Sequence, residues 1–488
     1  MNAPLRRVAV ACSLMLLALL VAANWIQAVE ADSLRNRPGN ARVIIQEYSR
    51  ERGAILVGER AIASSRETND ELKFLRRYSN GPLYAPATGY YSFVYGATGI
   101  ERAENEILAG TDSKLFVDRV AGLLTGETPK GGNVTLTLNP AAQRAADRGL
   151  DRLSGDARGA VVAIAPKTGA ILAMVSRPSY DPNRLSSHDG TAIREAFDKL
   201  NSDPSKPMLN RAISETYPPG STFKIVTSAA AIESGQFTPG SPVPGPAQLD
   251  LPQTRSNLPN FDGQQCSPGS DTTTLANALR RSCNTSFGAI GLQLGPDALR
   301  DQAEKFGFNR DDIQVPMTAA TSVFPADINP PQTAQSAIGQ FDVRATPLQM
   351  AMVVAGIANQ GSVMKPYLVE DIRAPDLSVL ESTRPDELSR AVSAQTAAQV
   401  TQMMVEVVEK GTGTNAKISG VQVAGKTGTA QIGGGKSPHA WFVSFAPADD
   451  PQVAVAVVVE NGAEQAEVSG NKLAAPIARQ VMEAVLNR

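Results

Sequence analysis

A serine followed three residues later by a lysine is the first pattern in this sequence that could carry covalent chemistry. The pattern occurs at Ser221/Lys224, Ser362/Lys365 and Ser469/Lys472. On a helix this spacing places both side chains on one face, so that the lysine amine can activate the serine hydroxyl without a histidine. The pattern is therefore informative only where a helix begins at the serine.

Local sequence favours the first of these three copies. Residues 217–220 contain two prolines and a glycine, and residues 222–232 carry apolar side chains at helical spacing, which predicts a helix that begins at Ser221. The unpaired amides of a helix N-terminus favour negative charge, and the Ser221 amide itself could donate to an oxyanion. Lys365 precedes a proline and Ser469 precedes a glycine and an asparagine, so we interpret both other copies as loops.

A Ser-x-Asn pattern supplies a second group of polar side chains. It occurs at Ser282/Asn284 and at Ser469/Asn471. The first copy falls between apolar stretches at 275–279 and 287–292, which predicts a connection between two helices. The Ser282 hydroxyl is suited to relay a proton to a leaving amine, and the Asn284 amide to hold a peptide group. Taken alone, the same residues are more typical of a helix cap, and only the neighbouring motifs favour a site.

A Lys-Thr-Gly pattern occurs at Lys167 and at Lys426. The copy at Lys167 lies where strand-like segments at 160–164 and 170–175 fold back on each other, so we interpret it as a β-turn. The copy at Lys426 follows a predicted strand at 421–424 and continues into an edge strand.

This edge strand has the donors that a substrate carboxylate requires. Lys426, Thr427 and Thr429 would bind the terminal carboxylate of a peptide, and Gly428 would allow close backbone approach. The Thr429 amide could supply a second oxyanion donor.

The elements that position these motifs predict an α+β domain. Strand-like runs at 421–424, 441–445 and 453–460 join the hairpin to make a sheet of about five strands. The region 185–407 between them is predicted to be mainly helical and loop-like, and a last helix covers 474–486. We therefore expect an antiparallel sheet flanked by helices and closed by segments distant in sequence.

The N-terminus predicts a membrane anchor. Arg6 and Arg7 precede an apolar run at 8–26, which as a helix would measure roughly 28 Å, near the thickness of a hydrocarbon core. We predict a cytoplasmic tail at 1–7, a single transmembrane helix at 8–28 and an extracytoplasmic remainder. A cleaved signal peptide is the competing interpretation, because small alanines follow the run.

Two regions follow the anchor. Residues 31–132 are polar, arginine-rich and turn-rich, which indicates a small N-terminal domain that ends in a linker at 128–132. Residues 133–488 have stronger periodicity and contain all the motifs above, so we assign them to the catalytic domain.

The cysteines, histidines and overall charge exclude several classes of function. Cys266 and Cys283 are the only exported thiols, and they form either a disulfide or two separate buried thiols. His188 and His439 lie in no recognisable nucleophile setting, and the few cysteines and histidines give no metal-ligand spacing, so we expect neither a metal nor a cofactor. A net charge of −2 excludes nucleic acid as a partner.

Taken in order along the chain, the motifs resemble those of the class B penicillin-binding proteins. The motifs are Ser221 to Lys224, Ser282 to Asn284 and Lys426 to Ala430. The resemblance extends to Arg52 to Leu56, Gly99 to Glu101, Gly159 to Gly169 and Asn210 to Ala212. The length and the small N-terminal domain are most similar to the PbpA type of actinobacteria.

The resemblance implies a monofunctional peptidoglycan D,D-transpeptidase that cross-links stem peptides through an acyl-serine and is acylated by β-lactam antibiotics. Lys224 would take the proton of Ser221, Ser282 would complete the catalytic group, and the remaining motif residues would bind substrate. It also implies that residues 31–132 are a pedestal or dimerisation-type domain. The partners implied are a membrane glycan polymerase and proteins of cell division or elongation.

Three rival functions share the motifs. A D,D-carboxypeptidase differs only in using water as the acceptor, so it remains the alternative. A β-lactamase must activate water for deacylation, and no Glu-x-x-Leu-Asn pattern follows Asn284. A β-lactam sensor would need a signalling segment inside the cell, and only about seven residues precede the apolar run.

Overall fold

The computed structural model describes residues 3–28, 48–116, 130–153, 157–431, 437–461 and 468–487. The first element is α1 (Ala3–Ala28), and it is long and apolar enough to cross a membrane. It begins at Ala3, so the helix includes most of the predicted tail at 1–7 as well as the predicted anchor. The first two residues of the predicted linker at 128–132 lie outside the described ranges.

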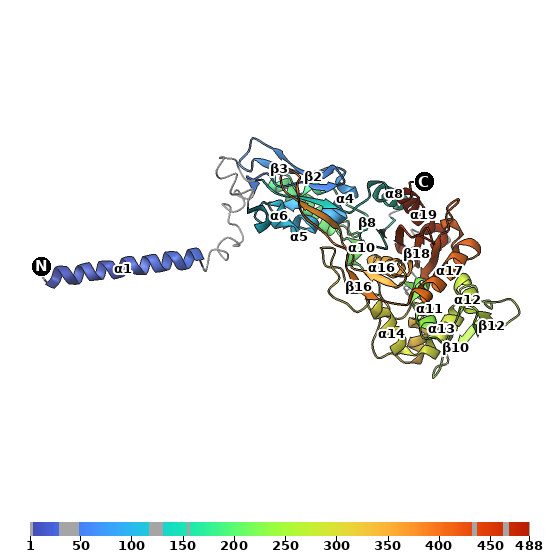
Figure 1. Ribbon diagram of the computed structural model, residues 1–488. Helices are drawn as coiled ribbons and strands as arrows, with labels where there is room; N and C mark the ends of the chain where they lie inside the picture. The colour runs from blue at the N-terminus through green and yellow to red at the C-terminus, as the bar shows by residue number, and fades with distance from the viewer. Residues whose placement is uncertain are drawn as a thin grey trace.

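A five-stranded antiparallel sheet forms the centre of the catalytic domain, as predicted (Figure 1). Its strands, in spatial order, are β17 (Ala424–Ala430), β18 (His439–Ala446), β19 (Val453–Val459), β7 (Gly159–Ile164) and β8 (Ile171–Arg177). Segments from both ends of the domain therefore pair, and β17 is an edge strand. The apolar runs of β18 and β19 are nearly continuous because both faces of the sheet are covered.

Helices cover the two faces of this sheet. One face packs against α8 (Pro140–Asp151) and α19 (Ala475–Val485), which share a core with alternate residues of β19. The other face packs against α11 (Lys224–Glu233) and α16 (Pro347–Ala358). Helix α17 (Ala394–Lys410) lies against β17.

A mainly helical region with short strand pairs extends beyond α11 (Figure 1). Its helices are α12 (Leu275–Arg281), α13 (Asn284–Leu294), α14 (Pro296–Lys305) and α15 (Pro330–Ser336). Its short strands are β9 (Pro242–Pro244), β10 (Gln248–Asp250), β11 (Asn257–Pro259) and β12 (Thr272–Thr274). The pairs β9–β12 and β10–β11 are antiparallel.

The N-terminal domain contains a mixed six-stranded sheet, and two of its strands come from late in the chain. The order is β15 (Val379–Ser382), β14 (Val369–Arg373), β6 (Asn133–Leu136), β1 (Ile55–Val57), β2 (Arg60–Glu67) and β3 (Phe74–Tyr78). The expectation of a mainly helical region at 185–407 is therefore wrong over 369–382. Strand β14 pairs with β6, more than two hundred residues away in sequence, and β15 pairs with β14.

Shorter elements complete the described chain. Around the N-terminal sheet lie α4 (Gly81–Thr88), β4 (Tyr91–Ser92), β5 (Gly96–Ala97), α5 (Gly99–Ala103), α6 (Asn105–Leu108) and η1 (Ser113–Leu115). In the catalytic domain lie η2 (Pro182–Arg184), α9 (Gly190–Ser202), α10 (Arg211–Ser214), β13 (Ser362–Met364), β16 (Glu387–Arg390), η4 (Thr414–Ala416) and α18 (Gly470–Leu473).

Candidate active site

Ser221 lies where the chain enters α11, as predicted. The first turn is the 3₁₀ helix η3 (Gly220–Phe223), which continues directly into α11 at Lys224. Two hydrogen bonds hold the preceding backbone: Thr222 Oγ1 donates to the Pro219 carbonyl at 2.7 Å, and Trp441 Nε1 donates to the Pro218 carbonyl at 3.1 Å. The start of the helix is thereby fixed to β18.

The Lys224 amine lies against the Ser282–Asn284 segment. Its Nζ donates to the Ser282 carbonyl and to Asn284 Oδ1, both at 2.7 Å, and lies 3.4 Å from Ser282 Oγ. In the described part of the chain none of its hydrogen bonds goes to Ser221. The structure therefore links Lys224 to Ser282 and Asn284 more directly than to the serine three residues before it.

The Ser282 hydroxyl lies between two lysines. Lys426 Nζ donates to Ser282 Oγ at 2.8 Å and to the Thr427 carbonyl at 2.8 Å. Ser282 connects α12 to α13 and has a φ of 65°, a left-handed conformation that costs a non-glycine residue about 1–3 kcal/mol. A strained backbone conformation of this kind persists only where the surrounding structure holds the residue in place, and it is common at active sites.

Both lysines are fully buried, and burial weakens their hold on a proton. Burial lowers the pKa of Lys224 well below its ordinary value, and the nearby charge of Lys426 lowers it further. Burial lowers the pKa of Lys426 to about 7. No carboxylate in the described chain offsets either effect. A neutral amine beside a hydroxyl is the arrangement that a general base requires.

Strand β17 faces the start of α11 at a point of very close approach. A Cβ on Gly428 would lie 2.9 Å from Thr222 Cγ2 and 3.1 Å from the Pro219 carbonyl oxygen, so only glycine fits without a shift. Thr427 Oγ1 lies 2.7 Å from Thr412 Oγ1. The predicted strand at 421–424 ends where β17 begins, so the Lys-Thr-Gly motif lies within the strand.

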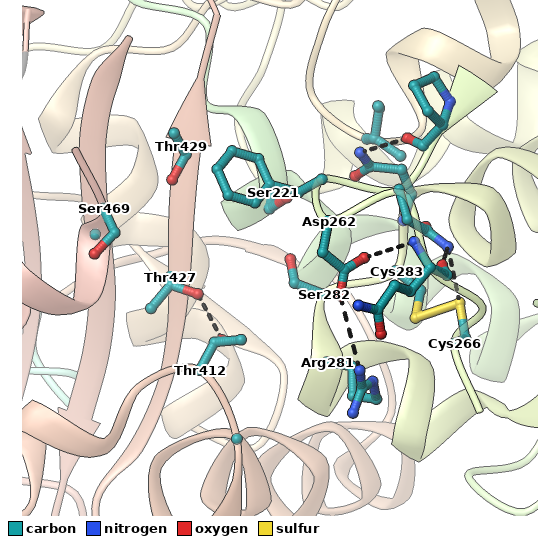
Figure 2. A pocket seen from close by; sticks show the side chains of 18 of the residues that line it. Ser221, Asp262, Cys266, Arg281, Ser282, Cys283, Thr412, Thr427, Thr429 and Ser469 are labelled. Carbon is teal, nitrogen blue, oxygen red and sulfur yellow. Dashed lines mark hydrogen bonds and ion pairs between the residues drawn. A yellow bond between two sulfur atoms is a disulfide. The ribbon is translucent and has the colours of Figure 1, made fainter. Parts of the chain in front are cut away.

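A cleft of about 890 Å³ brings the predicted site residues together. The predicted residues that line it are Ser221, Ser282, Cys283, Asn284, Thr427, Thr429 and Cys266. Figure 2 shows Thr427 and Thr429 on the β17 side of the cleft and Ser282 on the other. Lys224, Lys426 and Gly428 are not in the lining, and both lysines are buried.

Sequence reasoning missed several residues that line this cleft. They are Asn260, Phe261, Asp262, Gln340, Phe341, Thr412, Gly470 and others from loops far apart in the chain. Ser469 and Asn471 were assigned to a loop, yet they also line the cleft, and Ser469 caps α18 by accepting from the Lys472 amide. No local pattern marks these residues, because their proximity to Ser221 depends on tertiary contacts.

The other rival motif copies lie away from the cleft. Ser362 begins β13 instead of lying in a loop, and Lys365 pairs with Asp386. Lys167 lies in the turn between β7 and β8, as predicted, and pairs with Asp450.

Cys266 and Cys283 are joined by a disulfide in the structure, with their Cα atoms 5.9 Å apart. The bond attaches the residue between Ser282 and Asn284 to the loop that follows β11. The histidines lie elsewhere: His188 Nδ1 contacts Asp70 Oδ2 at 2.6 Å, and His439 Nδ1 accepts from the Asn461 amide. Over the described ranges no group of His, Cys, Asp and Glu side chains could hold a metal ion.

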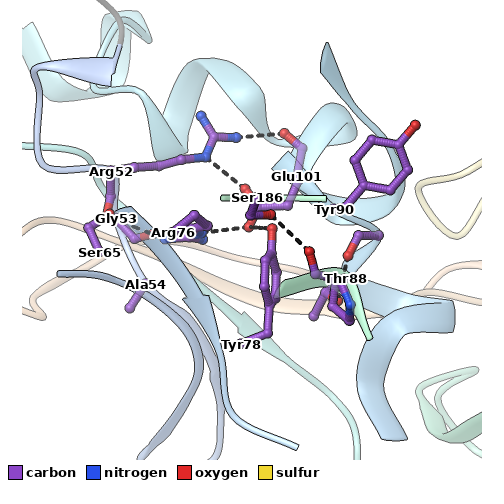
Figure 3. Close-up of polar contacts among 12 residues, drawn as sticks. Arg52, Gly53, Ala54, Ser65, Arg76, Tyr78, Thr88, Tyr90, Glu101 and Ser186 are labelled. Carbon is purple, nitrogen blue, oxygen red and sulfur yellow. Dashed lines mark hydrogen bonds and ion pairs between the residues drawn. The ribbon is translucent and has the colours of Figure 1, made fainter. Parts of the chain in front are cut away.

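A buried ionic cluster lies in the N-terminal domain, away from the cleft (Figure 3). Glu101 is fully buried and forms ion pairs with Arg52 at 2.7 Å and Arg76 at 2.6 Å, and it accepts from Tyr78 Oη at 3.0 Å. Burial opposes ionisation of Glu101, but the two arginine charges outweigh it and lower the pKa of this carboxyl. All three charged side chains of this cluster are buried and paired within the core of the domain.

Two family models match the chain. Residues 159–483 match the penicillin-binding protein transpeptidase domain, and residues 52–134 match the penicillin-binding protein A dimerisation domain. The first match contains the whole cleft described above, and the second contains the buried ionic cluster.

Individual relatives agree over nearly the full length. The chain is 47% identical to the peptidoglycan D,D-transpeptidase PbpA of Mycolicibacterium smegmatis, with 100% of this chain and 99% of that protein covered. It is 45% identical to PbpA of Mycobacterium tuberculosis, over 100% and 99%. The ceftriaxone acyl-enzyme of M. tuberculosis penicillin-binding protein A superposes with a TM-score of 0.88 at 44% identity, over 91% of this chain and 100% of that one. The chain therefore belongs to the class B penicillin-binding proteins, serine enzymes of the peptidoglycan D,D-transpeptidase family.

Proposed function

We propose that this protein cross-links peptidoglycan stem peptides, with Ser221 as the nucleophile and Lys224 as its base. The observation that carries the proposal is the pair of buried amines, Lys224 and Lys426, on either side of the Ser282 hydroxyl beside the cleft that contains Ser221. A classical Ser-His-Asp mechanism has no support, because neither histidine lies in this cleft.

In the first step Ser221 Oγ attacks the carbonyl of the penultimate D-Ala while the neutral Lys224 amine takes its proton. The Ser221 and Thr429 amides would stabilise the developing oxyanion. The Lys224 amine must turn from Ser282 towards Ser221 when substrate binds, since catalytic hydrogen bonds often tighten only in the complex. The terminal carboxylate of the substrate would bind Thr427 and Thr429.

The leaving D-Ala requires a proton as its amide bond breaks. Ser282 is suited to deliver it, because its hydroxyl contacts both lysines and lines the cleft. The protonated Lys224 amine returns a proton to Ser282, and the amine of a neighbouring stem peptide then attacks the acyl-serine. As the new amide bond forms and the ester bond to Ser221 breaks, the amine loses a proton to Lys224, which returns it to Ser221 Oγ. The Asn284 amide, held by Lys224, would orient the substrate backbone.

The expected location follows from α1. This apolar helix would anchor the protein in the cell membrane, with Arg6 and Arg7 on the cytoplasmic side and the catalytic domain outside. The partners proposed are a membrane glycan polymerase and proteins of division or elongation, which would supply the glycan strands that carry the stem peptides.

Mass spectrometry after treatment with benzylpenicillin tests the site. We expect one covalent adduct, on Ser221, and none in Ser221→Ala, while Ser469→Ala is a matched control that keeps its adduct. An adduct on any other residue would refute the assignment. A stem pentapeptide with an added D-amino acid then separates the alternatives: an exchanged peptide supports transpeptidation, and a shortened peptide alone supports the carboxypeptidase.

A further inference from the structure

Asn260 is a buried residue of the loop after β11, and its side chain is directed at the start of α13. Its Oδ1 accepts from the Asn284 amide at 2.8 Å, from the Thr285 amide at 3.1 Å and from Thr285 Oγ1 at 3.3 Å. Its Nδ2 donates to the Pro246 carbonyl at 3.1 Å and to the Gln264 carbonyl at 2.8 Å. The side chain is therefore bonded at both ends.

These bonds replace a helix cap that the local sequence does not provide. Helix α13 begins at Asn284, and the residue before it, Cys283, makes no capping hydrogen bond with its side chain. The first amides of a helix have no partner within the helix, so a buried helix start needs an acceptor from elsewhere. Asn260 supplies that acceptor from a segment 24 residues earlier.

The same loop also orients the Asn284 side chain. Asn284 Nδ2 donates to the Pro259 carbonyl at 3.1 Å, while Asn284 Oδ1 accepts from Lys224. Asn260 therefore fixes the backbone of Asn284. The carbonyl of the preceding residue, Pro259, binds the side-chain nitrogen of Asn284, so the side-chain oxygen is the atom that faces Lys224. A shift of this turn would move both the Ser282 hydroxyl and the partner of the proposed base.

We propose that Asn260 is a positioning residue for the Ser282–Asn284 turn, acting as the cap of α13 and through it on Lys224. This inference rests on the proposed function, in which those groups act on Ser221. The Cys266–Cys283 disulfide joins the same two segments, so the loop is attached to the turn by one covalent bond and one hydrogen-bonded side chain.

Acylation kinetics with benzylpenicillin test the proposal on the full-length protein. Asn260→Ala is expected to lower the limiting acylation rate at saturating penicillin about 10- to 100-fold, the cost of a misplaced catalytic group. The dissociation constant of the noncovalent complex should change little.

Asn133 provides the matched control. It is equally buried, at 7% exposed, and its side chain also joins two backbone segments, accepting from the Ala54 amide and donating to the Ala374 carbonyl far from the cleft. Asn133→Ala should leave the acylation rate of the folded protein unchanged. If Asn260→Ala does not fold, Asn260→Ser, which shortens the acceptor, takes its place with the same expected loss.

The possible results distinguish the positioning role of Asn260 from the proposed function of the site. An Asn260→Ala variant that acylates at the wild-type rate, an equal loss in Asn133→Ala, or a loss that lies wholly in the dissociation constant would overturn the role of Asn260. A wild-type protein without an adduct on Ser221 would instead reject the proposed function. A lower limiting acylation rate in Asn260→Ala, with a nearly unchanged dissociation constant and a wild-type rate in Asn133→Ala, supports the proposal.

Discussion

Substitution of Gly428 by alanine should separate catalytic geometry from stability. The added Cβ would lie 2.9 Å from Thr222 Cγ2, 3.0 Å from Trp441 Cβ and 3.1 Å from the Pro219 carbonyl oxygen. Carbon atoms at optimal van der Waals separation are about 3.5–4.0 Å apart, so β17 and the turn before Ser221 must separate by roughly 0.5–1 Å.

Two magnitudes follow from this separation. Overpacking of a filled interior costs about 1–3 kcal/mol in the free energy of unfolding. A misplacement approaching 1 Å between the nucleophile and the groups that bind substrate costs up to about 100-fold in rate. We therefore expect Gly428→Ala to fold, to lose about 1–3 kcal/mol of stability, and to be acylated about 10- to 100-fold more slowly.

The assay is the rate of adduct formation on Ser221 with benzylpenicillin, measured beside chemical denaturation. Gly425→Ala is the control on the same strand: its Cβ would meet Phe442 Cζ at 2.7 Å and Val408 Cγ2 at 3.1 Å, away from the serine turn. It should be destabilised by a similar amount but acylated at nearly the wild-type rate. Equal rates for Gly428→Ala and wild type, or equal losses in both variants, would refute the reasoning.

Two further predictions concern ionisation. Burial, reinforced by the Lys426 charge, lowers the pKa of Lys224, and burial lowers that of Lys426 to about 7, so uptake of protons in acid removes the neutral base. The acylation rate should therefore decrease as the pH falls through the lowered pKa of Lys224, and a rate that decreases with rising pH instead would contradict this assignment. Glu101→Gln leaves the buried Arg52 and Arg76 without their counter-charge, so it should lower the free energy of unfolding, measured by chemical denaturation, by about 3–5 kcal/mol. Glu381→Gln removes an exposed partner of Lys114 and should change this free energy little. Similar losses in the two variants would contradict the prediction.

The helix start and the turn next to the motifs could be predicted from the prolines and glycines that flank them. Two prolines and a glycine were expected to place the helix start at Ser221, and the structure has η3 from Gly220 and α11 from Lys224. The turn at Lys167 follows from its proline and glycine in the same way. The limits of β17 were less accurate, because residues 424–430 contain glycines and pair only through the register imposed by β18.

Local sequence patterns did not predict which strands pair when they are far apart in the sequence. Strand β14 joins the N-terminal sheet because β6 offers it backbone partners, and β15 then pairs with β14; the contact between β14 and β6 leaves no local signature. Ser469 and Lys472 were assigned to a loop, but Ser469 caps α18 and Lys472 lies in that helix, and the position of Ser469 in the cleft lining was not predicted either. The disulfide remained one of two alternatives until the Cα separation of Cys266 and Cys283 was known.

The sequence by itself determined the family, the apolar N-terminal helix and most of the strands that form the central sheet, because each is recognised from residues that are neighbours along the chain. The catalytic roles of those residues stay predictions. Only the tertiary structure decided that Lys224, Ser282 and Lys426 form one buried hydrogen-bonded group, since their contacts join residues 58 and 144 positions apart. Desolvation by the surrounding segments lowers the pKa of both amines, and a linear pattern does not contain that environment.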